Sequence, residues 1–177
     1  AAQPEPTPEE RYASPLEMLV SSDGQQLYVL CQGTDEVRVL NAASGRVLRI
    51  IQVGHEPRGF SLSPDGRRLF VTNSWDDTVT AADTNTGRVV ATWAAGYEPS
   101  SVMEDSTEKA LFVADRIGSN ITVLDAATGE VKVTLEAGRG ASYLAMAPDG
   151  SRLYATNVYP NRTPHRTPPM SEITVID

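Results

Sequence analysis

The chain has 177 residues, of which 40% are hydrophobic and 21% are charged, an ordinary globular composition that excludes disorder as the default. Its formal net charge of -8 leaves no basic field to attract nucleic acid or an anionic membrane, so we expect neither as a partner. No apolar run reaches the roughly 18 residues that a transmembrane helix needs.

Residues 1–14 form a Pro- and Glu-rich arm that begins "AAQPEPTPEE", without Met. Proline cannot donate a ladder hydrogen bond, so this arm is poorly suited to a strand. It resembles the mature end left after removal of a signal peptide, which favours a periplasmic or extracellular protein over an ordinary chain boundary. Cys31 is the single cysteine, so the sequence holds neither an intrachain disulfide nor a CxxCH haem-attachment motif.

A period of 42 residues organises the rest of the chain. One segment is written four times: "SSDGQQLYVLC" from Ser21, "SPDGRRLFVTN" from Ser63, "DSTEKALFVAD" from Asp105 and "APDGSRLYATN" from Ala147. A leucine followed by an aromatic residue keeps this interval, as do two sets of turn glycines, Gly45, Gly87 and Gly129 with Gly54, Gly96 and Gly138. Three independent markers therefore agree on one repeat.

The second repeat reads as four short strands over residues 58–63, 68–73, 78–83 and 88–95. β-Branched and aromatic residues fill these segments, and every break between them carries Gly, Pro, Asp or Asn. The Pro64-Asp65-Gly66 break is typical of a hairpin turn whose glycine takes a positive φ. No stretch of the sequence sustains a helical period.

Four antiparallel strands repeated every 40 to 45 residues indicate an all-β β-propeller. The register predicts blades at residues 15–56, 57–98, 99–140 and 141–177. The fourth copy carries a ten-residue insertion within 158–172 and reaches Asp177 without a fourth strand. Because an unpaired edge is an aggregation hazard, we expect further blades after Asp177, with a four-bladed ring as the alternative.

The segments "SPDGRRLFVTN", "APDGSRLYATN" and "ITVLDAATGEVKVTLEAG" resemble the YVTN-type β-propeller repeat, and the resemblance covers the chain from Pro15 onward. It implies a ring of commonly seven blades in an exported bacterial or archaeal surface protein. Related propellers include redox and lactone-hydrolysing enzymes. The Pro-rich insertion followed by "SEITVID" further resembles propellers that precede a c-type cytochrome region of the di-haem peroxidase kind, which would place haem c in an associated domain or partner rather than in this chain.

Three positions depart from the repeat pattern. Cys31 and Asp115 stand where the motif has Asn, and Glu104 stands where the other copies have an apolar residue. The third copy also lacks the Asp-Gly turn. The third blade is therefore the least regular, which indicates either drift or a site.

The loops that enter each first strand, and those between second and third strands, emerge on one face of a propeller. His55, Tyr97 and Arg139 share one register there, so we expect them to be neighbours around the rim. Trp75 lies in a loop of the same face, where a ligand or partner would reach it. In the insertion, prolines hold an extended segment whose cations suit an acidic surface. The partner-binding residues we predict are His55, Tyr97, Arg139, Trp75, Tyr159, Arg162, His165 and Arg166.

Other chemistries have weaker support. His55 and His165 are the only histidines, and we expect them to be exposed and not to bind a metal, since no third ligand is placed by the sequence. Asp76 and Asp77 lack the spacing of a calcium loop and are typical turn residues. No nucleophile with a base, and no carboxylate pair, can be assembled from these spacings, so no catalytic residue is predicted.

Three functions remain open. The first is an exported scaffold, without catalysis of its own, that binds a protein partner through the loop face and the insertion. The second is a module of a periplasmic c-type-cytochrome redox protein, in which the partner is a cytochrome. The third is hydrolysis of a lactone, for which no residue of the sequence gives specific evidence.

Overall fold

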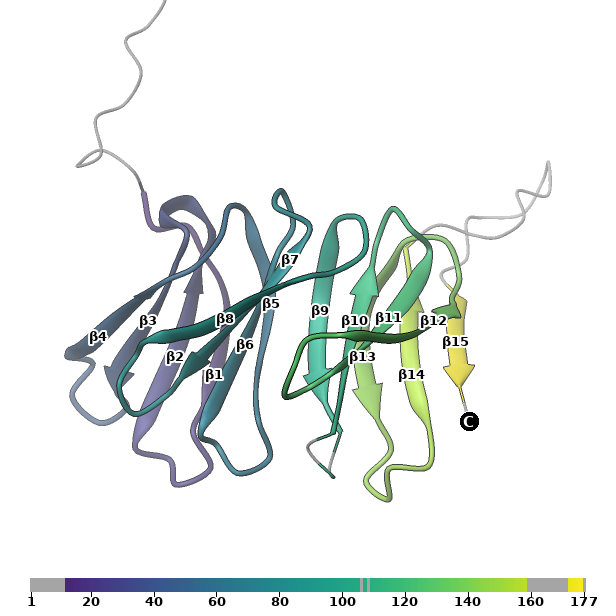
Figure 1. Cartoon of the computed structure of the whole chain (residues 1–177). Coiled ribbons are helices and arrows are strands. Elements are labelled where there is room, and N and C mark those ends of the chain that lie inside the picture. Colours follow the sequence, from purple (N-terminus) through teal and green to yellow (C-terminus); the bar gives the residue numbers. More distant parts are fainter. Residues whose placement is uncertain (1–11, 106, 108, 159–171, 177) are drawn as a thin grey trace, which may run out of the picture.

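The structure is a computed structural model that describes residues 12–105, 107, 109–158 and 172–176. Its strands form four sheets in series, which we call blades 1 to 4 (Figure 1). Blade 1 contains β1 (Pro15–Val20), β2 (Gln26–Cys31), β3 (Glu36–Asn41) and β4 (Val47–Gln52). Blade 2 contains β5 (Pro57–Leu62), β6 (Arg68–Asn73), β7 (Thr78–Asp83) and β8 (Val89–Ala94). Blade 3 contains β9 (Pro99–Glu104), β10 (Ala110–Asp115), β11 (Asn120–Asp125) and β12 (Val131–Glu136), and blade 4 contains β13 (Ala141–Met146), β14 (Leu153–Asn157) and β15 (Glu172–Ile176).

Each sheet is an antiparallel meander whose neighbouring strands are also neighbours in sequence. Blades 1 to 3 have four strands, and the described part of blade 4 has three. The predicted all-β propeller architecture is confirmed, and the strands of blade 2 lie within one residue of the predicted bounds. Apart from a 3-10 turn at Gln32–Thr34, no helix occurs among the described residues, so none there can cross a lipid bilayer.

The blades stand face to face with their first strands on the inner side, where β5, β9 and β13 lie next to one another. The middle strands β6 and β7 are buried along almost their whole length, whereas β8 alternates between exposed and half-buried positions. A lone sheet cannot bury both faces, so this burial comes from stacking. The stacking directs the connecting loops toward solvent at the two rims.

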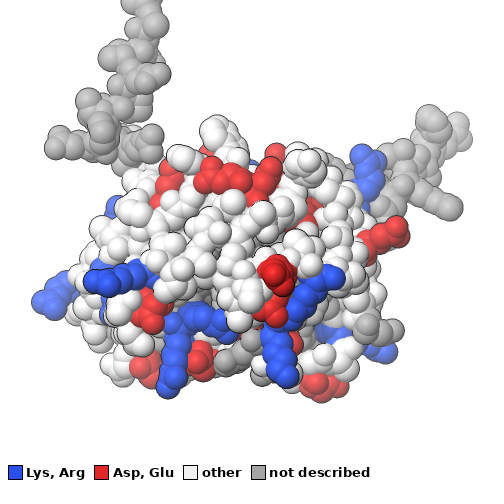
Figure 2. Space-filling view, viewed as in Figure 1, with Lys and Arg blue, Asp and Glu red and all other residues white. Residues whose placement is uncertain are grey.

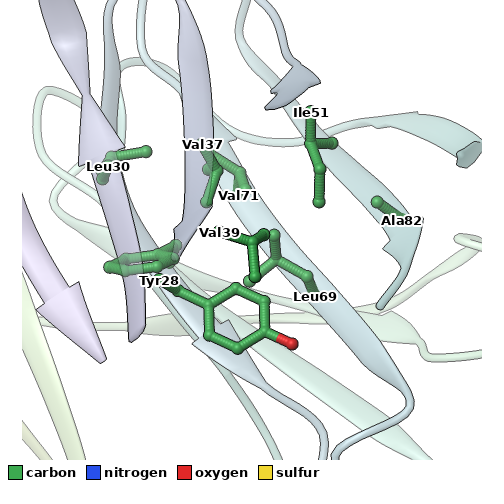
Figure 3. Close-up of a cluster of buried hydrophobic side chains, with 9 residues drawn as sticks. Tyr28, Leu30, Val37, Val39, Ile51, Leu69, Val71 and Ala82 are labelled. Carbon is green, nitrogen blue, oxygen red and sulfur yellow. The ribbon is translucent and has the colours of Figure 1, made fainter. Parts of the chain in front are cut away.

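The contact between blades 1 and 2 is a continuous apolar core (Figure 3). Val37 and Val39 of β3 point from blade 1 toward Leu69 and Val71 of β6, and all four side chains are fully buried. The continuous apolar run Leu69, Phe70 and Val71 in β6 is typical of a strand whose two faces each meet a neighbouring sheet. The interface therefore gains its stability mainly from removal of apolar surface from water.

The contact between blades 2 and 3 adds aromatic and charged groups. Phe70 and Trp93 stack with their ring centroids 6.4 Å apart, and the Arg68 guanidinium lies 5.3 Å from the Phe70 centroid. Arg68 then crosses to blade 3, where its Nη2 donates to Glu104 Oε1 and its Nη1 donates to the Ala126 carbonyl at 2.7 Å. Glu104 is thus an inter-blade ion-pair partner with a buried carboxylate. The irregular residue of the third copy has a structural role.

The two end faces of this arc expose apolar side chains whose repeat equivalents are buried. Ile173 pairs with Thr156 as Ile121 pairs with Ala114, yet Ile173 is 66% exposed and Ile121 is fully buried. At the other end Met18 is 64% exposed, whereas Phe60 at the same register is 5% exposed. Both end faces therefore have the composition of a blade interface.

Substitution of Gly129 can test the packing between blades 2 and 3. It has φ +74°, and a Cβ there would overlap the Trp93 indole, whereas Gly45, with φ +68°, has open space around its Cβ position. We expect Gly45→Ala to cost about 1–2 kcal/mol through the left-handed backbone alone. Gly129→Ala should cost about 1–3 kcal/mol more because Trp93 must move. Urea unfolding of both variants measures the difference, and equal losses would contradict the packing.

Candidate functional site

The candidate site is the rim that we call the loop face, formed by residues 32–35, 53–56, 74–77, 95–98, 116–119 and 137–140. These segments join second to third strands and one blade to the next, and they lie along the top of Figure 1. Acidic side chains, in red, are prominent along the same edge in Figure 2. The loop face is therefore a largely acidic rim on a rigid sheet scaffold.

In blades 2 and 3 a buried polar side chain at the end of the second strand anchors this rim. In blade 2, Asn73 Oδ1 accepts the Gly54 N–H at 3.0 Å, and Asn73 Nδ2 donates to the hydroxyls of Thr78 and Thr80 at 2.9 Å. Gly54 has no room for a Cβ, which would lie 2.6 Å from Asn73 Cγ. The Asn of the repeat motif is therefore a structural clamp between two blades.

Asp115 occupies the clamp position in blade 3. Its Oδ1 accepts the Gly96 N–H at 3.1 Å, and its Oδ2 accepts from the Thr122 hydroxyl at 2.6 Å. Burial of this fully enclosed carboxyl raises its pKa to about 6, because desolvation outweighs the two hydrogen bonds. In blade 1 the equivalent Cys31 is a buried thiol, and burial also raises its pKa, which disfavours the reactive thiolate.

Further hydrogen bonds tie the loops of blades 1 and 2 to the chain that enters the next blade. Asp35 Oδ1 accepts the Glu56 N–H at 3.0 Å, and Asp77 Oδ1 accepts the Glu98 N–H at 2.9 Å. The Ser74 hydroxyl donates to the Pro99 carbonyl at 2.6 Å. Side chains on this face are therefore presented from loops that cannot move independently.

His55 and Asp76 form a pair on the loop face of blade 2. His55 Nδ1 lies 3.0 Å from Asp76 Oδ1, and the His55 N–H donates to Asp76 Oδ2 at 2.8 Å. Burial works to raise the pKa of Asp76, but the bonds from His55 outweigh it and hold that pKa below its ordinary value. The carboxylate orients the imidazole, which remains largely exposed.

Three large apolar side chains project from adjoining loops. Trp75 is 76% exposed, Tyr97 is 69% exposed and Ile117 is 63% exposed. The Ile117 N–H donates to the Tyr97 carbonyl at 3.4 Å, and the loop of Trp75 is tied to that of Tyr97 through Asp77 and Glu98. We call these three residues the apolar ridge. It crosses blades 2 and 3 within the acidic rim.

The rim also carries arginines. Arg116 Nε and Nη2 both donate to Glu98 Oε2, at 3.1 and 2.9 Å, which neutralises that cation. Arg116 and Arg139 line one cavity of about 270 Å³, and Arg116 and Arg58 line a second. Within the described ranges, no three His, Cys, Asp or Glu side chains gather closely enough to hold a metal ion.

Of the predicted site residues, His55, Trp75, Tyr97 and Arg139 lie on the loop face. The Trp75 N–H donates to the His55 carbonyl at 3.4 Å, so these two are adjacent. Their part in binding stays a prediction. Tyr159, Arg162, His165 and Arg166 lie outside the described residues. Sequence reasoning missed Ile117 and Arg58, although the 42-residue register equates Ile117 with Trp75.

Stacked antiparallel sheets of this kind define a β-propeller. The profile of the family described as "Lactonase, 7-bladed beta-propeller" matches residues 2–102, so the chain belongs to that family. A search of curated proteins finds no match. Among solved structures, a chain of Kuenenia stuttgartiensis hydrazine synthase aligns with a TM-score of 0.77 and 24% identity, over 82% of this chain and 42% of that one. This likeness shows the fold, and the YVTN repeat type stays a prediction.

Asp115 makes a pH-dependent contribution that can be measured. Because its folded pKa of about 6 exceeds the ordinary 3.8, the folded state binds this proton more tightly than the unfolded chain. The contribution is complete below about pH 4 and is lost as the pH rises through 6, a change of about 3 kcal/mol. Asp115→Asn, which restores the residue of blades 2 and 4, should be more stable than the wild type at pH 7.

Denaturant unfolding of both proteins at pH 4, 5, 6 and 7 makes the comparison. Other carboxyls titrate equally in the two chains, so the difference between them isolates Asp115. The advantage of the variant should shrink toward pH 4. A variant less stable than the wild type at pH 7 would contradict the burial of an ionisable carboxyl at this clamp.

Proposed function

We propose that this propeller is a scaffold without catalysis of its own that docks a protein partner on its loop face. The observation that carries the proposal is the apolar ridge, Trp75, Tyr97 and Ile117, held on loops that hydrogen bonds fix to the blades. Large exposed apolar side chains on preorganised loops are the usual anchors of an interface. Scattered apolar residues would not carry this argument, but these three are on connected loops.

The charge around the ridge sets the chemistry of the partner. Asp35, Glu56, Asp76 and Asp77 lie along the same rim, and the whole chain carries a net charge of -8. An interface with an apolar centre and a charged rim gains association rate and specificity when the rims are complementary. We therefore propose a partner with a basic rim around an apolar or aromatic pocket.

The compartment belongs to the same proposal. The composition of residues 1–14 supports export to the periplasm or the extracellular space. A cytochrome is one form that the partner can take, in which case haem c resides in the partner or an associated domain. A haem absorption band in the native complex would identify that form.

Lactone hydrolysis is a second candidate, supported by the family match and by the His55–Asp76 pair. A carboxylate on Nδ1 fixes the imidazole tautomer that leaves Nε2 as a base. Such a base could take a proton from water as the water attacks a lactone carbonyl. Among the described residues, no second group is placed to stabilise the resulting oxyanion beside it, so we rank this candidate below docking.

Removal of the ridge tests docking. Trp75→Ala combined with Tyr97→Ala should weaken binding of the isolated partner by about 30-fold or more, because each anchor is worth on the order of 1–2 kcal/mol or more. The matched control is Val90→Ala, which removes a 61% exposed side chain from β8, away from the rim. The partner is first recovered by cross-linking to the wild-type chain in native extract and is then purified for calorimetry. Equal affinity of the two variants would refute the ridge as the docking site.

A lactonase assay separates the two candidates. Docking predicts that the wild-type chain hydrolyses no lactone faster than His55→Gln does. The second candidate predicts a loss of about 100-fold or more in His55→Gln, because a general base contributes that much. Rates are followed by proton release with a panel of five- and six-membered lactones. An activity that disappears in this variant would replace the docking proposal with hydrolysis.

A further inference from the structure

A cavity of about 210 Å³ opens on the inner side of the blades at the loop-face end. Each of the four first strands contributes its second residue to the wall, and these residues are Leu16, Arg58, Ser100 and Ser142. Arg116 and Tyr143 also line the cavity. Because the equivalent residue of all four blades lines the cavity, the cavity lies toward the centre of the propeller.

Arg58 contributes a cation to this wall, and none of the ion pairs among the described residues includes it. Its Nε is buried, and within the part of the chain that the structure describes it has no hydrogen-bond acceptor. The other arginines that reach between or across loops are paired: Arg68 with Glu104, and Arg116 with Glu98. A partly buried guanidinium without a partner is costly, so this position favours an anion that arrives from outside.

The serine hydroxyls in the cavity wall already donate to backbone carbonyls. The arginines therefore supply the N–H donors that a ligand could use. The Ser142 hydroxyl donates to the Gly140 carbonyl at 2.8 Å, and the single proton of Ser100 faces the carbonyls of Ala141 and Ser142 at 3.1 Å. Arg116 commits Nε and Nη2 to Glu98 and retains its other N–H groups. Glu98 pairs with Arg116 and cancels its positive charge. The cavity lining therefore has a net charge of +1, which Arg58 supplies.

The rest of the wall is apolar. Leu16 is 53% exposed and Tyr143 is 66% exposed, and both line the cavity. The volume lies below the roughly 300 Å³ at which drug-sized pockets begin. One net positive charge, an apolar wall and a small volume fit one ligand class.

We propose that this cavity binds a small organic monocarboxylate, whose carboxylate pairs with Arg58 and whose apolar body lies against Leu16 and Tyr143. Arg58 presents planar N–H donors that match a carboxylate in geometry. The site is independent of the apolar ridge, so it stands or falls apart from protein docking.

The test is calorimetric titration of the full chain with benzoate at constant ionic strength, beside two other probes. Benzamide has the same shape without the charge, and inorganic phosphate is an anion without the apolar body. The variant is Arg58→Ser, the residue that blades 3 and 4 carry at this register. The matched control is Arg67→Ser, which removes an exposed arginine from the opposite rim.

We expect benzoate to bind the wild type and Arg67→Ser alike, and Arg58→Ser at least tenfold more weakly. Benzamide and phosphate should each bind the wild type at least tenfold more weakly than benzoate. Equal binding of benzoate and benzamide, equal binding of benzoate and phosphate, or unchanged binding in Arg58→Ser would each overturn the proposal, as would no binding of benzoate.

Thermal unfolding gives a second readout that does not depend on the basal stability of the variant. Benzoate should raise the melting temperature of the wild type and of Arg67→Ser by the same amount, and that of Arg58→Ser by less. If the serine variant fails to fold, Arg58→Leu takes its place, since Leu16 occupies this register in blade 1. A benzoate-induced rise in the Arg58 variant equal to that of the wild type would overturn the proposal.

Discussion

Burial of both faces of the middle strands in an inner blade is the constraint on which this structure depends. β6 and β7 are buried on either side because blades 1 and 3 cover them, and no single blade is able to achieve this alone. Stacking fixes which residues are apolar, and it also sets where polar chemistry is allowed. Charged groups between blades must be paired, as Arg68 is with Glu104, or else they lie at the rims.

The rims obtain their rigidity from a small set of buried polar clamps. Asn73 satisfies a backbone N–H of the preceding connection and two threonine hydroxyls at once, so its amide matches the site in both donors and acceptors. Asp115 offers acceptors only, and it holds the same geometry with a carboxyl that prefers its proton. Asp differs from Asn by one side-chain heavy atom. At position 115 this difference makes the hydrogen bonds that support the loop face depend on the protonation state of a buried carboxyl.

The sequence was sufficient for the fold because the repeat states each element several times. The interval from Leu27 to Leu69 and Leu111, together with the turn glycines, predicted the repeat, and the strands of blade 2 were predicted to within one residue. It was not sufficient for the site, because a period fixes the register of a residue and not the partner of its side chain. Asp76 read as an ordinary turn residue, but it holds His55, and Glu104 read as drift or a site, but it pairs with Arg68 from another blade. Arg58 was not predicted as a site residue, because only the structure shows that its buried Nε has no acceptor among the described residues.

The hydrogen bonds that support the loops join equivalent positions of successive blades, Asp35 to Glu56 and Asp77 to Glu98, and they use backbone N–H groups as donors. None of them involves the side chains of Trp75 or Tyr97. The frame and the displayed residues are consequently separable. The side chains at positions 75 and 97 can be exchanged while the frame is retained, so the chemistry that the loop face presents can change through a few surface substitutions at little risk to folding.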